Sequence, residues 1–456
     1  MRSNRTQVKE YYRQITSIDI GRIARELLGQ RVFHESERLL QCDCPIHKSQ
    51  SHRSLQIMLD RQGWYCFGCG VGGDVLQLVE FIQSGQVTRG QSGAMPEDHR
   101  KARDFLASKL GLPPLSKHGL SPDEMGQIEA SRSAELRVRA VLTEMAAYYH
   151  QKLKCNPEIL RWLRSKYSIS EATIDRLLIG YADNMGGKEG SRGVIGTLIG
   201  GSSCFSPGNL AASGAFRPTS QDGLEPFFDR RITFPYWSRG RVVFMIGRKT
   251  PWTPDEPWEK GKYKKLPVHD ENDRKFIAPC IDNSHLYNED CLLSNPERLI
   301  ITEGVTDCIS LMEQGFPVIS PVTVQFREAD WERLVPRLRK VKAIYLCQDN
   351  EISQAGLNGA LKTASVLTKS GVQTKLVILP LGDKQDKARS ELRDRFGLAA
   401  AADSRDVARV LDGRSQEEIR EAEKLLAEAK IDVNDYFLSG HSARDFEELL
   451  RIAQTP

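Results

Sequence analysis

The sequence predicts a multidomain α/β protein in which a small metal-binding domain precedes a larger core. Three observations lead to this prediction. The chain has 456 residues, which corresponds to about two to four domains rather than one ordinary core. Paired cysteine and histidine residues with ligand spacing lie within residues 44–69. From residue 298 onward, apolar strand-like runs alternate with helical segments, which is typical of a mainly parallel sheet with helices on its faces.

Composition and charge narrow the class of protein. Hydrophobic residues make up 40% of the chain, and no apolar run approaches the roughly 20 residues that span a bilayer. The N-terminus lacks the apolar core of a signal peptide, so we expect a cytoplasmic protein with no membrane partner, in which ten cysteines do not form a disulfide framework. The net charge of +4 is too small to indicate a nucleic-acid partner, and only local clusters can do so.

Four segments are expected along the chain. Residues 1–111 form the metal-binding domain, and the Pro-, Gly- and Ser-containing stretch 112–127 forms a linker. Residues 128–297 begin with helices and continue with short β-like runs among basic residues. Residues 298–456 form the parallel-sheet domain, interrupted by a charged helical insertion over 384–430.

The metal-binding domain is predicted from two short ligand pairs. Cys44 and His47 are separated by eighteen residues from Cys66 and Cys69, so each pair sits on a tight turn and the intervening loop brings the turns together. Such a set suits tetrahedral Zn²⁺, and four protein ligands leave no open position. We therefore expect one structural zinc ion, with Cys42 as a spare cysteine.

Aromatic and basic residues surround these ligands. Trp64, Tyr65 and Phe67 lie near several cations, an arrangement that grips a single nucleic-acid strand by stacking and phosphate contact. The alternative is that the aromatic residues form the small core of the domain. We expect the core for Tyr65 and Phe67, and Trp64 remains a candidate nucleic-acid contact.

A second set of candidate ligands follows the predicted parallel strands. Glu303 ends a strand and Asp307 opens the next helix, whereas Asp349 and Glu351 follow another strand and Asp432 comes after the insertion. Carboxylates that meet at one sheet edge repel each other unless cations neutralise them, and oxygen ligands select Mg²⁺ or Mn²⁺. Any one of these acids has an ordinary explanation at a turn or helix start. Three sets at strand ends favour a catalytic metal site.

The last of these sets leaves alternatives open. Asn434 and Asp435 compete with Asp432 as the third ligand position, and Asp383 or Asp386 in the run LGDKQD is an earlier candidate.

A basic segment precedes the acidic set. Residues 226–265 carry ten Lys and Arg and four Asp and Glu, a net charge of +6, which exceeds the +4 of the whole chain. This is the local electrostatic signature that a nucleic-acid partner requires.

These motifs resemble bacterial DnaG-type primases. The run CPIHKSQSHRSLQIMLDRQGWYCFGCG looks like the zinc ribbon of that family, and residues 297–381, resuming near 430, resemble its TOPRIM domain. The runs DRRITFPYWSRGRVVFMIGRK and GKYKKL resemble the first part of its polymerase core. The resemblance implies a zinc ribbon, then a primase core with a helical and mixed α/β subdomain and a TOPRIM parallel-sheet subdomain.

The resemblance also assigns roles. It implies that Glu303 assists proton transfer or binds metal, that Asp349 and Asp432 hold metals, and that Asp307 supports them. Nucleotide or template contacts are implied for basic residues of the +6 segment, namely Arg231, Arg248, Lys262, Lys264 and Lys265. Two departures stand out, because the family's Asp-x-Asp motif is here Asp349-Asn350-Glu351, and its Gly-Thr loop is here Pro321-Val322-Thr323.

We therefore expect a nucleotidyltransferase, a DNA primase that makes short RNA primers on single-stranded DNA from nucleoside triphosphates by a two-metal mechanism. The alternatives are a TOPRIM nuclease and a non-catalytic nucleic-acid-binding protein of a mobile element. Only about 20 residues follow Asp435, so the helicase-binding domain common in the family is not evident, and a shortened, specialised primase is expected. A helicase or another replication protein remains a candidate partner.

Overall fold

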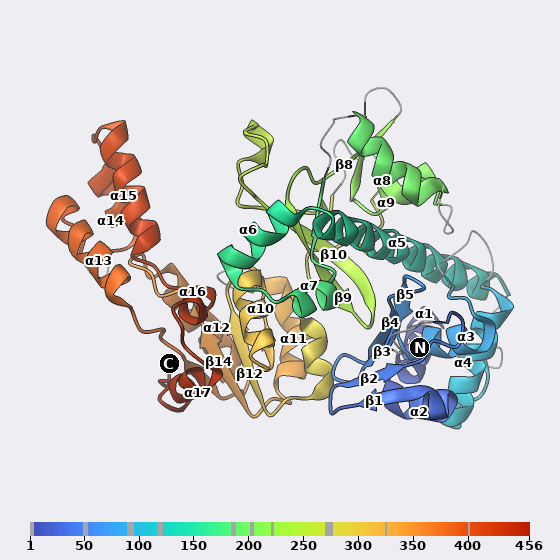
Figure 1. Ribbon diagram of the computed structural model, residues 1–456. Coiled ribbons are helices and arrows are strands. Elements are labelled where there is room, and N and C mark those ends of the chain that lie inside the picture. The colour runs from blue at the N-terminus through green and yellow to red at the C-terminus, as the bar shows by residue number, and fades with distance from the viewer. Residues whose placement is uncertain are drawn as a thin grey trace. The chain divides into compact units, whose positions relative to one another are not determined.

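The computed structural model describes residues 4–48, 53–88, 95–115, 122–183, 188–200, 205–219, 223–269, 277–323, 326–399 and 402–456 (Figure 1). The chain forms two compact units. The first unit holds residues 1–157 and 174–285, and the second holds 158–173 and 286–456. The chain therefore passes between the units three times, a division that differs from the expected boundaries at 112, 128 and 298.

The expected linker is partly helical. Residues 116–121 lie outside the described part of the chain, and the long helix α5 (Pro122–Lys154) already begins at Pro122.

The first unit begins with helices α1 (Asn4–Ile15) and α2 (Ile20–Leu28). The second helix begins separately because Asp19 caps α2 by accepting a hydrogen bond from the Arg22 N–H at 2.6 Å. An antiparallel sheet in the order β1-β2-β3-β4-β5 follows, with α3 and α4 after it. The bounds are β1 (Val32–Glu35), β2 (Leu39–Cys42), β3 (Leu55–Met58), β4 (Gly63–Cys66), β5 (Val71–Gly73), α3 (Val75–Ser84) and α4 (Glu97–Lys109).

The remainder of the first unit is built around a second antiparallel sheet, ordered β11-β10-β9-β6, against which α5 packs. The predicted β-like runs become β9 (Ile232–Ser238) and β10 (Arg241–Arg248), which form a hairpin. The other elements are β6 (Gly180–Tyr181), α8 (Lys188–Gly200), α9 (Pro207–Ala212), β7 (Phe216–Pro218), β8 (Leu224–Pro226) and β11 (Tyr263–Lys265). Helix α7 (Glu171–Leu177) lies where the chain returns to this unit.

The turn of the β9–β10 hairpin lies against the N-terminal sheet within the first unit. A Cβ atom added to Gly63 would lie 2.5 Å from the backbone nitrogen of Gly240, and Gly240 has a φ of +76°. Because neither position has room for a side chain, glycine is required for this close backbone approach.

The second unit contains the predicted parallel sheet, ordered β13-β12-β14-β15 (Figure 1). Its strands are β12 (Arg298–Thr302), β13 (Val318–Ile319), β14 (Ala343–Cys347) and β15 (Thr374–Leu376), and all three pairings are parallel. Its other helices are α6 (Pro157–Tyr167), α10 (Val305–Glu313), α11 (Trp331–Leu338), α12 (Ala355–Lys369), α16 (Val433–Leu438) and α17 (Ala443–Arg451). The predicted multidomain α/β fold is confirmed.

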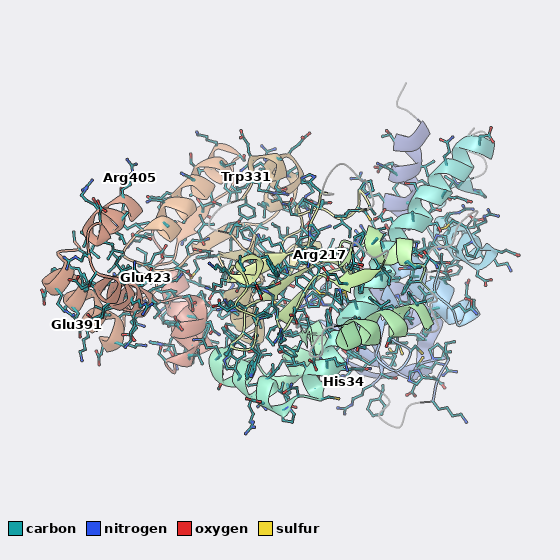
Figure 2. The ribbon with its side chains drawn as sticks, turned by 90° about the horizontal axis from the view of Figure 1, so that it is seen from above. His34, Arg217, Trp331, Glu391, Arg405 and Glu423 are labelled. Atoms are coloured by element: carbon teal, nitrogen blue, oxygen red, sulfur yellow. The ribbon has the colours of Figure 1, made fainter. Side chains whose placement is uncertain are left out.

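Three helices occupy the segment expected as an insertion: α13 (Asp383–Phe396), α14 (Ser404–Leu411) and α15 (Gln416–Glu428). They share a small hydrophobic cluster that includes Leu392, Phe396 and Leu425. Figure 2 shows Glu391, Arg405 and Glu423 on these helices. Short 3₁₀ segments complete the structure: η1 (Gly29–Arg31), η3 (Pro257–Glu259), η5 (Glu289–Ser294) and η6 (Glu328–Asp330). Within the described residues, no helix has the length and apolarity needed to cross a bilayer.

Candidate active site and metal centres

The four predicted zinc ligands meet in the N-terminal sheet. Cys44 follows β2, His47 lies in the next turn, and Cys66 and Cys69 flank the turn between β4 and β5. The Sγ atoms of Cys44 and Cys69 are 3.8 Å apart, and His47 Nδ1 lies 3.1 Å from Cys69 Sγ and 3.7 Å from Cys66 Sγ. Sulfur ligands about 2.3 Å from a tetrahedral zinc ion lie roughly 3.8 Å apart, so the set fits Zn²⁺ as a structural site.

Two neighbouring residues define the limits of this zinc site. A Cβ atom on Gly68 would lie 2.1 Å from His47 Nε2, so glycine is needed there to leave room for the imidazole ring. Cys42 is fully buried at the end of β2 and is not among the clustered ligands, and burial raises the pKa of its thiol to about 12. Cys42 is therefore a small core residue.

The structure places Trp64 in the core rather than on a nucleic-acid surface. Its side chain is fully buried, stacks on Phe81 with ring centroids 4.8 Å apart, and donates a hydrogen bond to the carbonyl of Asp74 at 3.1 Å. Tyr65 is also buried, as expected, whereas Phe67 is 39% exposed. Of these three aromatic residues, Phe67 alone presents a large surface for stacking on a base.

The acidic residues of the second unit converge at one edge of the parallel sheet. Strands β12 and β14 pair in register from Arg298 opposite Ala343 to Thr302 opposite Cys347, so both strands end at the same edge. Carboxylate oxygens of Asp307, Asp349 and Asp432 lie within 4.8 Å of one another. Three carboxylates this close fit a divalent cation with oxygen ligands, Mg²⁺ or Mn²⁺.

Charge repulsion within this cluster is visible in the pKa values. Burial raises the pKa of Asp307 well above its ordinary value, and the charges of Asp432 and Asp349 raise it further. Burial also raises the pKa of Asp349 to about 6, although Lys430 opposes that shift. A bound cation would relieve this repulsion.

The structure distinguishes the three candidates for the third ligand position, Asp432, Asn434 and Asp435. Asp432 belongs to the cluster and caps α16, its Oδ1 accepting a hydrogen bond from the Asp435 N–H at 2.7 Å. The backbone N–H of Asn434 donates to Asp307 Oδ1 at 3.1 Å, which holds that carboxylate in place. Among the described residues, the earlier candidates Asp383 and Asp386 lie in the first turn of α13 and not in the cluster.

Lys430 is a residue of the acidic site that the sequence did not single out. Its ammonium group pairs with Asp349, and the charges of Asp349, Glu351 and Glu303 all raise its pKa against the effect of burial. Glu303 and Glu351 therefore lie near enough to Lys430 to stabilise its charge, and Asp349, its ion-pair partner, also belongs to the cluster of three aspartates. The only sequence signal was a cation two residues before Asp432.

The altered loop after β13 also has a structural account. Val322 has a left-handed φ of +53°, a conformation that glycine adopts more readily, which fits the glycine expected there by family resemblance. The hydroxyl of Ser320 accepts a hydrogen bond from the Val322 N–H and donates one to the carbonyl of Glu303, both at 3.0 Å. Ser320 thus ties this loop to the end of β12.

The basic segment divides into buried and accessible residues. Arg231 is fully buried, pairs with Glu259 at 2.7 Å and donates to the carbonyls of Glu259, Gly247 and Gly261. The expectation that Arg231 contacts a phosphate is therefore wrong for this structure, because its guanidinium group is used to join β9 to the segment before β11. Lys264 is partly buried and also pairs with Glu259.

Three other basic residues of the segment are better placed to meet a ligand. Arg248 and Lys262 approach the ring of Tyr263, with 5.1 Å and 5.9 Å to its centroid, and Lys265 is exposed at the end of β11.

Comparison with known proteins supports the two metal centres. The family model described as CHC2 zinc finger matches residues 14–89, and the one described as Toprim-like matches residues 300–388. The DNA primase of Haemophilus influenzae is 22% identical over 375 residues, covering 79% of this chain and 55% of that protein. The DNA primase of Pseudomonas aeruginosa is 26% identical over 376 residues, covering 77% and 48%. The chain thus spans about half the length of these curated relatives.

One solved structure is similar along most of the chain. The crystal structure of the Aquifex aeolicus primase, comprising zinc-binding and RNA polymerase domains, superposes with a TM-score of 0.50 at 19% identity, covering 92% of this chain and 90% of that one. This similarity confirms the predicted fold.

Proposed function

We propose that this chain, which is similar to bacterial DnaG-type DNA primases, is a nucleotidyltransferase that makes short RNA primers on single-stranded DNA. The observation that carries this proposal is the convergence of Asp307, Asp349 and Asp432 at the edge of a Toprim-like sheet. The CHC2 zinc finger on the same chain supports a template-binding role in preference to a general nuclease.

The residues of the site suit such a reaction. The three clustered aspartates would hold Mg²⁺ or Mn²⁺, which supply positive charge where a primer hydroxyl attacks a nucleoside triphosphate and pyrophosphate leaves. Glu303 lies at the end of β12 beside this cluster and is proposed to accept the proton of the attacking hydroxyl. Lys430 keeps Asp349 ionised at neutral pH by pairing with it.

The proposed nucleic-acid contacts are the accessible basic residues. Arg248, Lys262 and Lys265 are proposed to contact triphosphate or strand phosphates, and Phe67 to stack on a template base. The partners we propose are single-stranded DNA, nucleoside triphosphates and a helicase or other replication protein, in the cytoplasm, where such DNA is found.

The proposal is tested by a priming assay with the full chain. Single-stranded DNA, labelled ribonucleotides and Mg²⁺ or Mn²⁺ should give short labelled products, and Asp349→Asn or Asp432→Asn should reduce them by at least about 100-fold. Asp412→Asn, an exposed substitution in the insertion, serves as the control. If Asp349→Asn and Asp432→Asn leave product formation intact, the site assignment is wrong.

The same assay separates the alternatives. Shortening of labelled DNA without nucleotides would indicate a nuclease. Binding of DNA without any metal-dependent product would indicate a non-catalytic protein.

A further inference from the structure

A pocket of about 520 Å³ lies within the first unit, between α1, α5 and the turn of the β9–β10 hairpin. Six cationic side chains line it, against two acidic ones, which gives a net charge of +4. The cationic residues are Lys9, Arg13, Arg132, Arg139, Arg239 and Arg241, and the acidic residues are Asp74 and Glu135. None of the roles proposed above uses this pocket.

The pocket brings guanidinium groups together against their mutual repulsion. Burial lowers the pKa of Arg139, and the positive charges of Arg241 and Arg132 lower it further, whereas Glu135 opposes the shift. Arg241 is 8% exposed. Like charges held together at a buried site are stabilised by a bound anion.

The two acids of the wall account for only part of this charge. Asp74 pairs with Arg241 at 2.8 Å, and Glu135 pairs with Arg139 at 2.5 Å. Arg132 is instead held by the ring of Tyr12, with its guanidinium carbon 4.1 Å from the ring centroid. The Nε atoms of Arg132, Arg139 and Arg241 are buried, and within the described residues none has a hydrogen-bond partner. The wall therefore holds cationic groups whose hydrogen-bonding capacity is not fully used within the described residues.

The shape and charge of the pocket define the class of ligand. Its volume falls in the range of small-molecule sites, and guanidinium groups bind phosphate oxygens in bidentate fashion. A triphosphate carries on the order of four negative charges near neutral pH, opposite in sign to the net charge of the wall, in which Arg13 is also paired with Glu10. Val8, Tyr12 and Leu136, all buried, form the apolar part of the wall.

We propose that this pocket binds the phosphate chain of a free nucleoside triphosphate. A strand carries its charge at one phosphate per nucleotide, so a compact cluster of cations suits a polyphosphate better. The site consists of residues of the first unit alone, whereas the acidic cluster belongs to the second. The proposal goes beyond the priming function, since binding here requires neither the acidic cluster nor template.

The test measures binding of ATP to the full, zinc-loaded chain by calorimetry in buffer without added Mg²⁺ or Mn²⁺. Arg132→Gln should weaken ATP binding about tenfold or more, because it removes a charged phosphate donor. Glu135→Gln should tighten binding, because it raises the net charge of the wall to +5. Lys101→Gln, an exposed substitution on α4, should leave binding unchanged. A general structural defect would weaken binding in both pocket variants, so opposite effects identify the pocket.

Three further probes distinguish the sources of phosphate and the two sites. Inorganic triphosphate should compete with ATP, whereas adenosine should not. Asp349→Asn should abolish priming yet leave this binding intact, so failure of the priming proposal and failure of this one give different results. The proposal is overturned if Arg132→Gln leaves ATP binding unchanged, or if it weakens binding of a short single-stranded oligonucleotide but not of ATP.

Discussion

Replacing Asp74 by asparagine tests how the first unit is held together. Asp74 caps α3, its Oδ1 accepting hydrogen bonds from the N–H groups of Leu76 and Gln77, while its Oδ2 accepts one from Arg241 at 2.8 Å. Burial raises the pKa of Asp74, but the charge of Arg241, aided by two further arginines, outweighs burial and lowers it. The side chain is therefore an ionised carboxylate paired in the interior.

The structure sets the size of the expected effect. The side chains of Asp74 and Arg241 are 6% and 10% exposed, so solvent screens the pair little. Asparagine keeps an N-cap acceptor but leaves the guanidinium group of Arg241 without its counter-charge, and removing one partner of a buried pair costs about 3–5 kcal/mol. Asp74→Ala should cost about 1 kcal/mol more, because it also removes the cap.

The measurement is native-state hydrogen exchange at the amides of α3 and β10, because a chain with two units need not unfold in one step. Glu297→Gln is the control, since its ion pair with Lys342 is exposed on both sides (78% and 74%) and should contribute less than about 1 kcal/mol. The reasoning is refuted if Asp74→Asn costs no more than Glu297→Gln. Changing both partners, as Asp74→Asn with Arg241→Met, should recover part of the lost stability.

Three other predictions follow from the metal centres. Cys66→Ser should abolish zinc binding and unfold the N-terminal sheet, whereas Cys42→Ser should retain one zinc ion per chain by atomic absorption. Lys430→Gln should tighten Mn²⁺ binding severalfold in spin-resonance titrations, since it removes a competing cation from Asp349, and an affinity equal to that of the control Lys424→Gln would contradict this. The pKa of Asp349 is about 6 in the folded chain, above its unfolded value. Without metal, the contribution of Asp349 to the free energy of unfolding is therefore fully present below pH ~4. Up to about 3 kcal/mol of it is lost as pH rises through 6. Hydrogen exchange of β14 at about pH 4 and at about pH 7 measures this loss; Mg²⁺ should reverse it at the higher pH, and an equal pH dependence in Asp349→Asn would show another origin.

The parts of the site that the sequence predicted are those tied to local chain geometry. The spacing of Cys44 and His47, and of Cys66 and Cys69, fixes two turns, and carboxylates at the ends of parallel strands meet because the strands end at one edge. Turns and strand ends are marked in the sequence, so the fold class, the zinc ligands and the acids that follow β12 and β14 were accessible before the structure. Asp432 was one of several candidates for the remaining position.

The residues that were predicted wrongly or missed depend on contacts between distant segments. Arg231 is buried because Glu259, 28 positions later in the chain, pairs with it. Trp64 is buried because α3 covers it. Lys430 enters the acidic site only because three helices precede it and return the chain to the segment after β14, where Asn350 and Ile431 form an isolated bridge. No local pattern around these residues carried that information.

The three passages of the chain between its units have a consequence for its biosynthesis. Residues 158–173 belong to the second unit, and the side chain of Asn434 donates to the carbonyl of Tyr167 at 2.8 Å, across 267 positions. At about 5–20 residues per second, translation of that interval takes on the order of 15–50 s. During this time α6, whose Ile159 and Leu163 are buried in the finished protein, cannot form the hydrogen bond between Tyr167 and Asn434. The nascent chain therefore carries α6 without its hydrogen bond to Asn434 until nearly the whole chain has been synthesised.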